Sequence, residues 1–172
     1  PTPRKGVDHL VEAIALLLRS SATVVVAVNH MGVGEALMGL SASLDLGSRV
    51  RFVGLLTGEQ RLAALADADL LVYPSTDEIF GLVPFEGLLC GAPVVVAGDG
   101  GGGELIAGAG AGLLAKYGNV AGLQARIRTL LEDEAAGQAM VRRGRRYVAD
   151  RLCFGRVAEQ HETLYAQVLE QA

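Results

Sequence analysis

Runs of β-branched residues alternate with helix-like segments along almost the whole 172-residue chain. The clearest run, residues 22–28 (ATVVVAV), is continuous, as expected for a parallel strand that is covered on both faces. Further strands are predicted at residues 49–53, 70–73, 93–97 and 112–115. Helices are predicted at residues 7–19, 34–46, 59–66, 81–90, 104–107, 120–132, 134–150 and 154–169. Strands separated by helices imply right-handed crossovers, so the pattern predicts an α/β domain with a doubly wound parallel, Rossmann-like sheet.

Size and composition agree with one folded domain spanning residues 1–172. The hydrophobic fraction of 51% and the charged fraction of 20% exclude a disordered tail. No apolar run reaches the roughly 20 residues that span a bilayer, and no secretory signal is visible. Cys90 and Cys153 have no CxxC partner, which favours a reduced, cytoplasmic setting. Because the first residue is Pro1 rather than Met, we expect a processed or excised piece.

The net charge of −4 argues against nucleic acid as the main partner. Six of the 15 basic residues nevertheless fall in one short stretch, Arg142, Arg143, Arg145, Arg146, Arg151 and Arg156. A basic helix face of this kind is compatible with a peripheral membrane contact or a partner lobe, and equally with an ordinary solvated surface.

The segment 75–86, between a predicted strand and a predicted helix, has features that suit a sugar nucleotide. In parallel sheets, ligands bind at the carboxyl ends of the strands. Phe80, Gly81 and Leu82 are expected to open the helix, so that their amides and the positive end of the helix dipole receive a diphosphate. Glu86, one turn beyond Leu82, is placed to accept bonds from ribose hydroxyls, and Glu78 to reach the sugar.

The run YPSTDEIFGLVPFEGLLCGAPVVV, in which seven residues separate two glutamates, resembles the E-x7-E region of the retaining glycosyltransferases of family 4, which have the two-lobed GT-B fold. RKGVDHLVEAIALL, RVRFVGLLTGEQRLAALADADLLVYPS, GGGGELI and LYAQVL also match in the right order. The resemblance covers nearly the whole chain but only the C-terminal lobe of the family. It therefore implies that the N-terminal acceptor lobe is absent from this chain and that the chain alone has no transferase activity.

By resemblance, Glu78 is the catalytic residue that contacts the donor sugar. Lys5, which corresponds to the lysine of the family's K-G element, is implied to pair with the diphosphate. The donor-binding role extends to Phe80, Gly81, Leu82, Val83 and Glu86. Arg4, Val53 and Gly101 are further candidates, the last within a G-G-x-x-E loop at residues 100–104 that we interpret as a sharp turn with left-handed residues.

Other motifs are weaker. The glycine run at residues 98–103 satisfies G-x-G-x-x-G, but it follows the fourth strand rather than the first, and Asp99 would repel a pyrophosphate. Asp67 and Asp69 precede a strand, which places them away from the binding edge. His30 follows the first strand and is either a ligand contact or loop filler. Residues 29–32 (NHMG) also depart from the family's G-D-G-P.

The function that the resemblance implies is retaining transfer of a hexosyl group from a nucleoside diphosphate sugar to a hydroxyl acceptor. No metal ligands and no obligatory metal or other cofactor are expected, because amides, a helix dipole and Lys5 neutralise the diphosphate. The alternatives are a sugar-nucleotide epimerase or phosphorylase of the same fold, and a non-catalytic nucleotide-sugar-binding module. The base, the sugar, the acceptor and the oligomeric state stay open.

Overall fold

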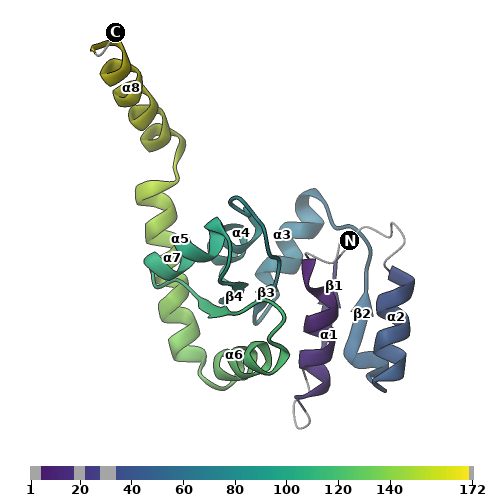
Figure 1. The fold of residues 1–172 in the computed structure, drawn as a ribbon. Helices are drawn as coiled ribbons and strands as arrows, with labels where there is room; N and C mark the ends of the chain where they lie inside the picture. Colours follow the sequence, from purple (N-terminus) through teal and green to yellow (C-terminus); the bar gives the residue numbers. More distant parts are fainter. Residues whose placement is uncertain (1–4, 18–21, 28–33, 171–172) are drawn as a thin grey trace.

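The computed structural model describes residues 5–17, 22–27 and 34–170 of the chain (Figure 1). The strands are β1 (Val24–Val26), β2 (Val50–Phe52), β3 (Leu71–Tyr73), β4 (Val94–Ala97) and β5 (Leu113–Ala115). The helices are α1 (Val7–Ala15), α2 (Gly34–Ser43), α3 (Gly58–Ala66), α4 (Val83–Cys90), α5 (Gly101–Gly108), α6 (Val120–Glu132), α7 (Glu134–Arg151) and α8 (Phe154–Glu170), with a short 3-10 helix η2 (Gly47–Arg49) before β2.

The described strand pairs are all parallel, which confirms the predicted α/β class. Val25 of β1 pairs with Arg51 of β2, and Val95 of β4 lies in register between Val72 of β3 and Leu113 of β5. Within the described residues the ladder forms two sections, β1-β2 and β3-β4-β5, rather than one continuous sheet. Parallel pairing places the carboxyl ends of the strands within each section at a common edge.

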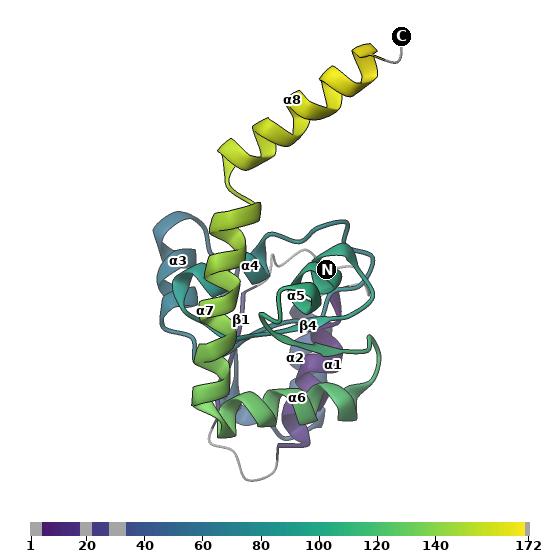
Figure 2. The same cartoon turned by 90° about the vertical axis from the view of Figure 1, so that its left-hand side faces the viewer.

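Strand β4 separates two hydrophobic cores, which is the arrangement that a doubly wound sheet requires. All its residues are buried. Val95 packs with α1, α6 and β1, whereas Val94 and Val96 pack with α4, α5 and α7 on the opposite face. Successive side chains of a strand point to opposite faces, so the uninterrupted apolar run of β4 fits a strand covered on both. The same prediction for the run at residues 22–28 is wrong, because Val25 in the middle of β1 is 52% exposed. Figure 2 shows α7 running beside β4 and α6 passing below it.

Glycines let α4 approach its neighbours closely. A Cβ atom on Gly87 would lie 2.5 Å from a methyl carbon of Leu71 in β3. On the other side, a Cβ on Gly144 of α7 would lie 2.7 Å from a methyl carbon of Leu88. A glycine at position 87 is therefore explained by the contact between α4 and β3.

The basic stretch partly stabilises helix ends. Arg145 donates to the carbonyl oxygens of Leu88 (3.1 Å) and Leu89 (2.9 Å), at the C-terminus of α4. Arg143 donates to the carbonyl of Gly110, just after α5, at 2.6 Å. Carbonyls at a helix end lack intrahelical partners and favour cations. These two arginines are thus bound to the protein itself, and Arg156 pairs with Glu159 on α8.

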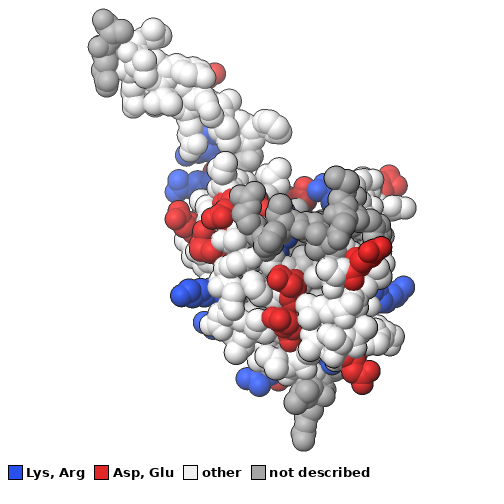
Figure 3. Space-filling model, turned by 45° about the vertical axis from the view of Figure 1, so that its right-hand side comes forward, with Lys and Arg blue, Asp and Glu red and all other residues white. Residues whose placement is uncertain are grey.

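Helix α8 projects away from the body of the domain (Figures 1 and 2). None of its residues is buried. Its apolar face is partly uncovered, because Val157, Leu164, Tyr165 and Val168 are 36%, 54%, 62% and 58% exposed. Figure 3 shows the projecting arm as mostly uncharged on the visible face, with basic side chains near its base. No helix in the described ranges has the length and apolar character needed to cross a membrane.

Candidate functional site

The site is built on the loop that connects β3 to α4. This loop contains two left-handed residues, Asp77 (φ 54°) and Gly81 (φ 71°). Helix α4 begins at Val83 with Leu82 as its N-cap, so the prediction that Phe80, Gly81 and Leu82 open the helix is wrong by two or three residues. The positive φ of Gly81 is incompatible with a helical turn, which is why the helix starts after it.

The first turn of α5 packs directly on the backbone of this loop. The Gly101 amide donates to the Glu78 carbonyl at 3.1 Å. A Cβ atom would lie 2.1 Å from the Ile79 carbonyl oxygen at Gly101, and 2.2 Å from the Phe80 carbonyl oxygen at Gly102. Only glycine allows two backbones to approach this closely. The glycine run therefore fixes the position of the site loop.

This packing corrects the interpretation of residues 100–104. We expected a sharp turn with left-handed residues, but Gly101 begins a helix and Gly100 is extended, with φ −147° and ψ 166°. The glycines serve close approach rather than left-handed geometry. Gly101 does lie beside Glu78, but the hydrogen of its amide is already bonded to the loop.

Glu78 is anchored by two donors. Its Oε1 atom accepts hydrogen bonds from the Lys5 ammonium and, at 2.7 Å, from the Ser75 hydroxyl. These bonds, that from Lys5 foremost, hold the pKa of the Glu78 carboxyl below its ordinary value. The same contact raises the pKa of Lys5. Both groups are therefore charged across the neutral pH range.

Lys5 reaches Glu78 because of the glycine that follows it. Gly6 is the N-cap of α1 and has φ 60°. A Cβ atom there would lie 2.3 Å from the carbonyl oxygen of Pro74, at the end of β3. This contact brings the start of α1 to the end of β3, where the Lys5 ammonium lies 5.9 Å from the centre of the Tyr73 ring. Two predicted site residues that are far apart in sequence are thus brought together.

Glu86 lies in the first turn of α4 and faces a different neighbour. Its amide donates to the Leu82 carbonyl at 3.0 Å, which confirms that it stands one turn beyond Leu82. Its Oε2 atom accepts a bond from the Arg61 guanidinium of α3 at 2.8 Å. The Glu86 side chain is 24% exposed, so it remains accessible to a ligand.

Backbone donors lie between the two glutamates. Within the described part of the chain, the amides of Phe80, Gly81, Leu82 and Val83 donate to no acceptor. The next residue, Pro84, has no amide hydrogen. The Phe80 ring stacks on Phe85, with centroids 5.2 Å apart. Unpaired amides at the start of a helix attract anions.

Val53 follows β2 and is 40% exposed. Its amide donates to the Val26 carbonyl at 3.1 Å, which places it at the carboxyl end of the β1-β2 pair. No described contact joins it to Lys5, Glu78 or Glu86. Arg4, His30 and the 29–32 loop lie outside the described residues.

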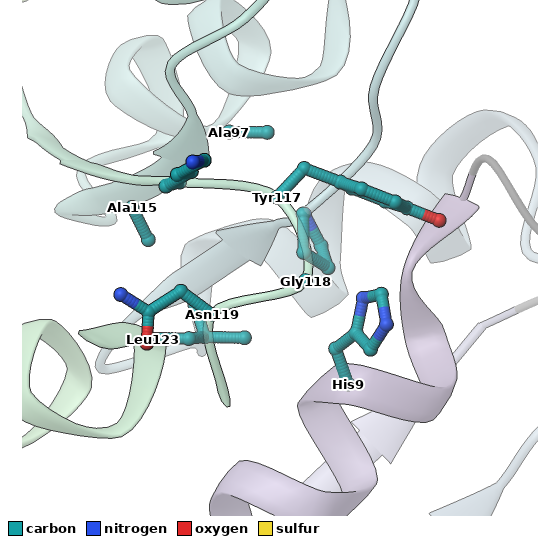
Figure 4. A pocket seen from close by; sticks show the side chains of 9 residues that line it. His9, Ala97, Ala115, Tyr117, Gly118, Asn119 and Leu123 are labelled. Atoms are coloured by element: carbon teal, nitrogen blue, oxygen red, sulfur yellow. The ribbon is translucent and has the colours of Figure 1, made fainter. Parts of the chain in front are cut away.

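Two hollows lie near the carboxyl ends of the strands. One is lined by Tyr73, Ser75, Glu78, Phe80, Pro84, Val96, Ala97, Gly100, Gly102 and Gly103, and contains the predicted catalytic carboxylate. The other is lined by His9, Pro74, Ala97, Ala115, Lys116, Tyr117, Gly118, Asn119 and Leu123 (Figure 4). There the His9 ring packs edge-to-face on Tyr117, with centroids 4.8 Å apart. The first hollow holds charge partners and free amides nearby, so we take it as the candidate site.

Sequence reasoning missed several residues that hold the site in place. Ser75 binds Glu78, and the Thr76 hydroxyl donates to Asp99, which ties the β3–α4 loop to the β4–α5 loop. Ser75 stands two residues after the end of β3 and three residues before Glu78, a spacing that could have suggested the bond. No sequence spacing indicates the bond between Arg61 and Glu86, because the two residues are 25 positions apart.

Comparison with known proteins finds a matching protein family. A family model described as Glycosyl transferases group 1 matches residues 2–147. The glycogen synthase of Mycobacterium tuberculosis is 42% identical over 95 residues, covering 55% of this chain and 23% of that protein. The N-acetyl-alpha-D-glucosaminyl L-malate synthase of Bacillus anthracis is 30% identical over 165 residues, covering 96% of this chain and 43% of that protein.

Solved structures agree. HepE of Anabaena, crystallised with UDP-glucose, superposes with a TM-score of 0.85 at 28% identity, covering 96% of this chain and 46% of HepE. The chain therefore spans less than half the length of the relatives described above.

Proposed function

The chain belongs to the group 1 glycosyl transferases and has the fold of the C-terminal lobe of a GT-B enzyme, and on that premise we propose that it binds a nucleoside diphosphate sugar. We propose further that the complete protein is a retaining family 4 enzyme. It would transfer the hexosyl group to a hydroxyl acceptor held by another part of the protein.

One observation carries the proposal: the loop with unpaired amides at residues 80–83 also contains Glu78, to which Lys5 is bonded. These amides donate to no acceptor among the described residues. Lys5 is held close to the same loop by the close approach of Gly6 to Pro74. Together they offer a diphosphate several N–H donors and a positive charge. As the sugar leaves its diphosphate, these same groups stabilise the negative charge that develops there.

The two glutamates take different parts of the donor. Glu86, on the α3 side, accepts from the ribose hydroxyls. Glu78, on the α1 side, lies in the hollow and contacts the sugar. The Lys5 ammonium has three N–H donors, so it can keep its bond to Glu78 while it offers another hydrogen to the diphosphate. We propose that no metal is needed for this step.

The relatives support a nucleotide sugar as ligand. HepE has been crystallised with UDP and with UDP-glucose. UDP is therefore the first nucleotide to test here, with GDP and ADP beside it.

Isothermal titration with UDP, GDP and ADP tests the proposal. We expect one of the three to bind best, with modest affinity, and EDTA to leave that binding unchanged. The absence of heat and of NMR shifts with all three at millimolar concentration would refute the nucleotide site. Binding that disappears with EDTA would refute the metal-free part alone.

A further inference from the structure

The family resemblance assigns no function to the ion pair between Arg61 and Glu86. Arg61 lies in the N-terminal half of α3, and Glu86 in the first turn of α4. The guanidinium Nη1 atom lies 2.8 Å from Oε2 of Glu86, and the two side chains are 43% and 24% exposed. Surface ion pairs contribute little to stability, at most about 1 kcal/mol. The contribution of Arg61 to the free energy of folding through this pair is therefore small.

The geometry leaves one carboxylate oxygen of Glu86 available. Oε2 is bonded to Arg61, and Oε1 has no hydrogen-bond partner among the residues that the structure describes. A glutamate side chain that is free to rotate loses conformational entropy when it binds a ligand. A carboxylate already held on one oxygen loses less, and it presents the other oxygen in a fixed direction.

We propose that Arg61 is a positioning residue for ribose recognition, holding Glu86 so that its free oxygen accepts from the ribose hydroxyls. This inference rests on the proposed nucleotide site. The residue acts through Glu86, so its effect depends on the hydroxyls that Glu86 contacts. A ligand without those hydroxyls gains nothing from the pair.

The test measures the affinity of the unaltered chain and of Arg61→Ala for two ligands. These are the preferred nucleoside diphosphate and its 2′,3′-dideoxy analogue. We expect Arg61→Ala to weaken binding of the ribonucleotide about three- to tenfold, and binding of the dideoxy analogue less than about twofold. Arg61→Lys, which keeps a cation at the same place, should recover most of the lost affinity.

Arg156→Ala is the matched control, because it removes an ion pair of the same 2.8 Å length on the projecting helix α8. It should leave both affinities unchanged. Thermal unfolding of each variant reports whether it has kept its fold.

Equal loss for both ligands in a folded Arg61→Ala would overturn the proposal, because Arg61 would then act on the diphosphate or on the loop. No loss for either ligand would overturn it as well. Failure of the unaltered chain to bind either ligand would refute the nucleotide site itself.

Discussion

At the scale of single residues, the two site glutamates should respond differently to substitution. Glu86→Ala removes the proposed acceptor of the ribose hydroxyls, so we expect binding of the free nucleoside diphosphate to weaken by roughly 1.5–3 kcal/mol. Glu78→Ala should not weaken that binding, because its proposed partner is the sugar and because its loss releases Lys5. Titration of both variants with the preferred nucleoside diphosphate measures the difference.

The same pair of variants in the complete protein separates binding from turnover. There Glu78→Ala should lower kcat for the sugar nucleotide while nucleotide affinity is kept. Equal loss of nucleotide affinity in both variants would show that the division of roles is wrong.

The pair between Lys5 and Glu78 also predicts a dependence of stability on pH. The folded-state pKa of Glu78 is lowered, so its contribution is present above the unfolded pKa and is lost as the pH falls through the folded one. The pKa of Lys5 is raised, so its contribution is present below the unfolded value and is lost only as the pH rises through the folded value. The pair is therefore intact at neutral pH and lost in acid.

The measurement compares the thermal midpoint of the unaltered chain with that of Glu78→Gln. A small gap should exist near about pH 7 and close as the pH falls below the folded-state pKa of Glu78, where both chains carry a neutral group at this position. Since the side chains of Lys5 and Glu78 are 46% and 27% exposed, the gap should correspond to less than about 1 kcal/mol. Glu162→Gln, on exposed α8, is the control. A gap that persists unchanged in acid would contradict the prediction.

Positions that depend on local order along the chain could be predicted, and contacts that depend on packing could not. Glu78 and Glu86 flank the start of one helix, so a single segment placed both. The partner of Glu86 is Arg61, which is set by how α3 packs on α4. The ion pair between Lys5 and Glu78 likewise depends on the close approach of Gly6 to Pro74, and no local pattern shows that approach.

At the scale of elements, the glycine turn of α5 should tolerate no side chain. Gly101→Ala would place its Cβ 2.1 Å from the Ile79 carbonyl oxygen, so either the site loop or the helix must move. We expect a loss of about 1–3 kcal/mol in the free energy of unfolding, together with weaker nucleotide binding. Denaturant unfolding and titration measure the two effects.

Gly108→Ala is the control on the same helix, since nothing lies within 4 Å of its Cβ position. It should leave stability unchanged or raise it by up to about 1 kcal/mol. A Gly101→Ala protein as stable as the unaltered chain would show that the loop yields easily and does not depend on this contact.

Element type was predictable here, but boundaries and glycine roles were less so. The predicted bounds of α6 agree with the structure, whereas α4 begins two residues later than predicted, because Gly81 is left-handed. A run of glycines is equally compatible with a turn and with close packing. Choosing between them requires knowing that the backbone of residues 78–80 lies against it.

At the scale of the whole molecule, the two-core architecture follows from one strand. The uninterrupted VVVA run of β4 is fully buried, with Val95 in one core and Val94 and Val96 in the other. The sequence therefore predicts a sheet that is covered on both faces. It does not show that the described ladder divides between β1-β2 and β3-β4-β5, because pairing depends on the short strands meeting in register.

Helix α8 should contribute almost nothing to the stability of this domain. Folding free energy comes mainly from apolar burial, and α8 buries none of its residues, whereas Leu88 in the core is 0% exposed. Removal of residues 154–172 should therefore shift the thermal midpoint by less than about 4 °C and leave nucleotide affinity unchanged. Leu88→Ala, by contrast, should cost about 2–5 kcal/mol. A truncated chain that unfolds as early as Leu88→Ala would show that α8 packs on the domain in solution rather than projecting from it.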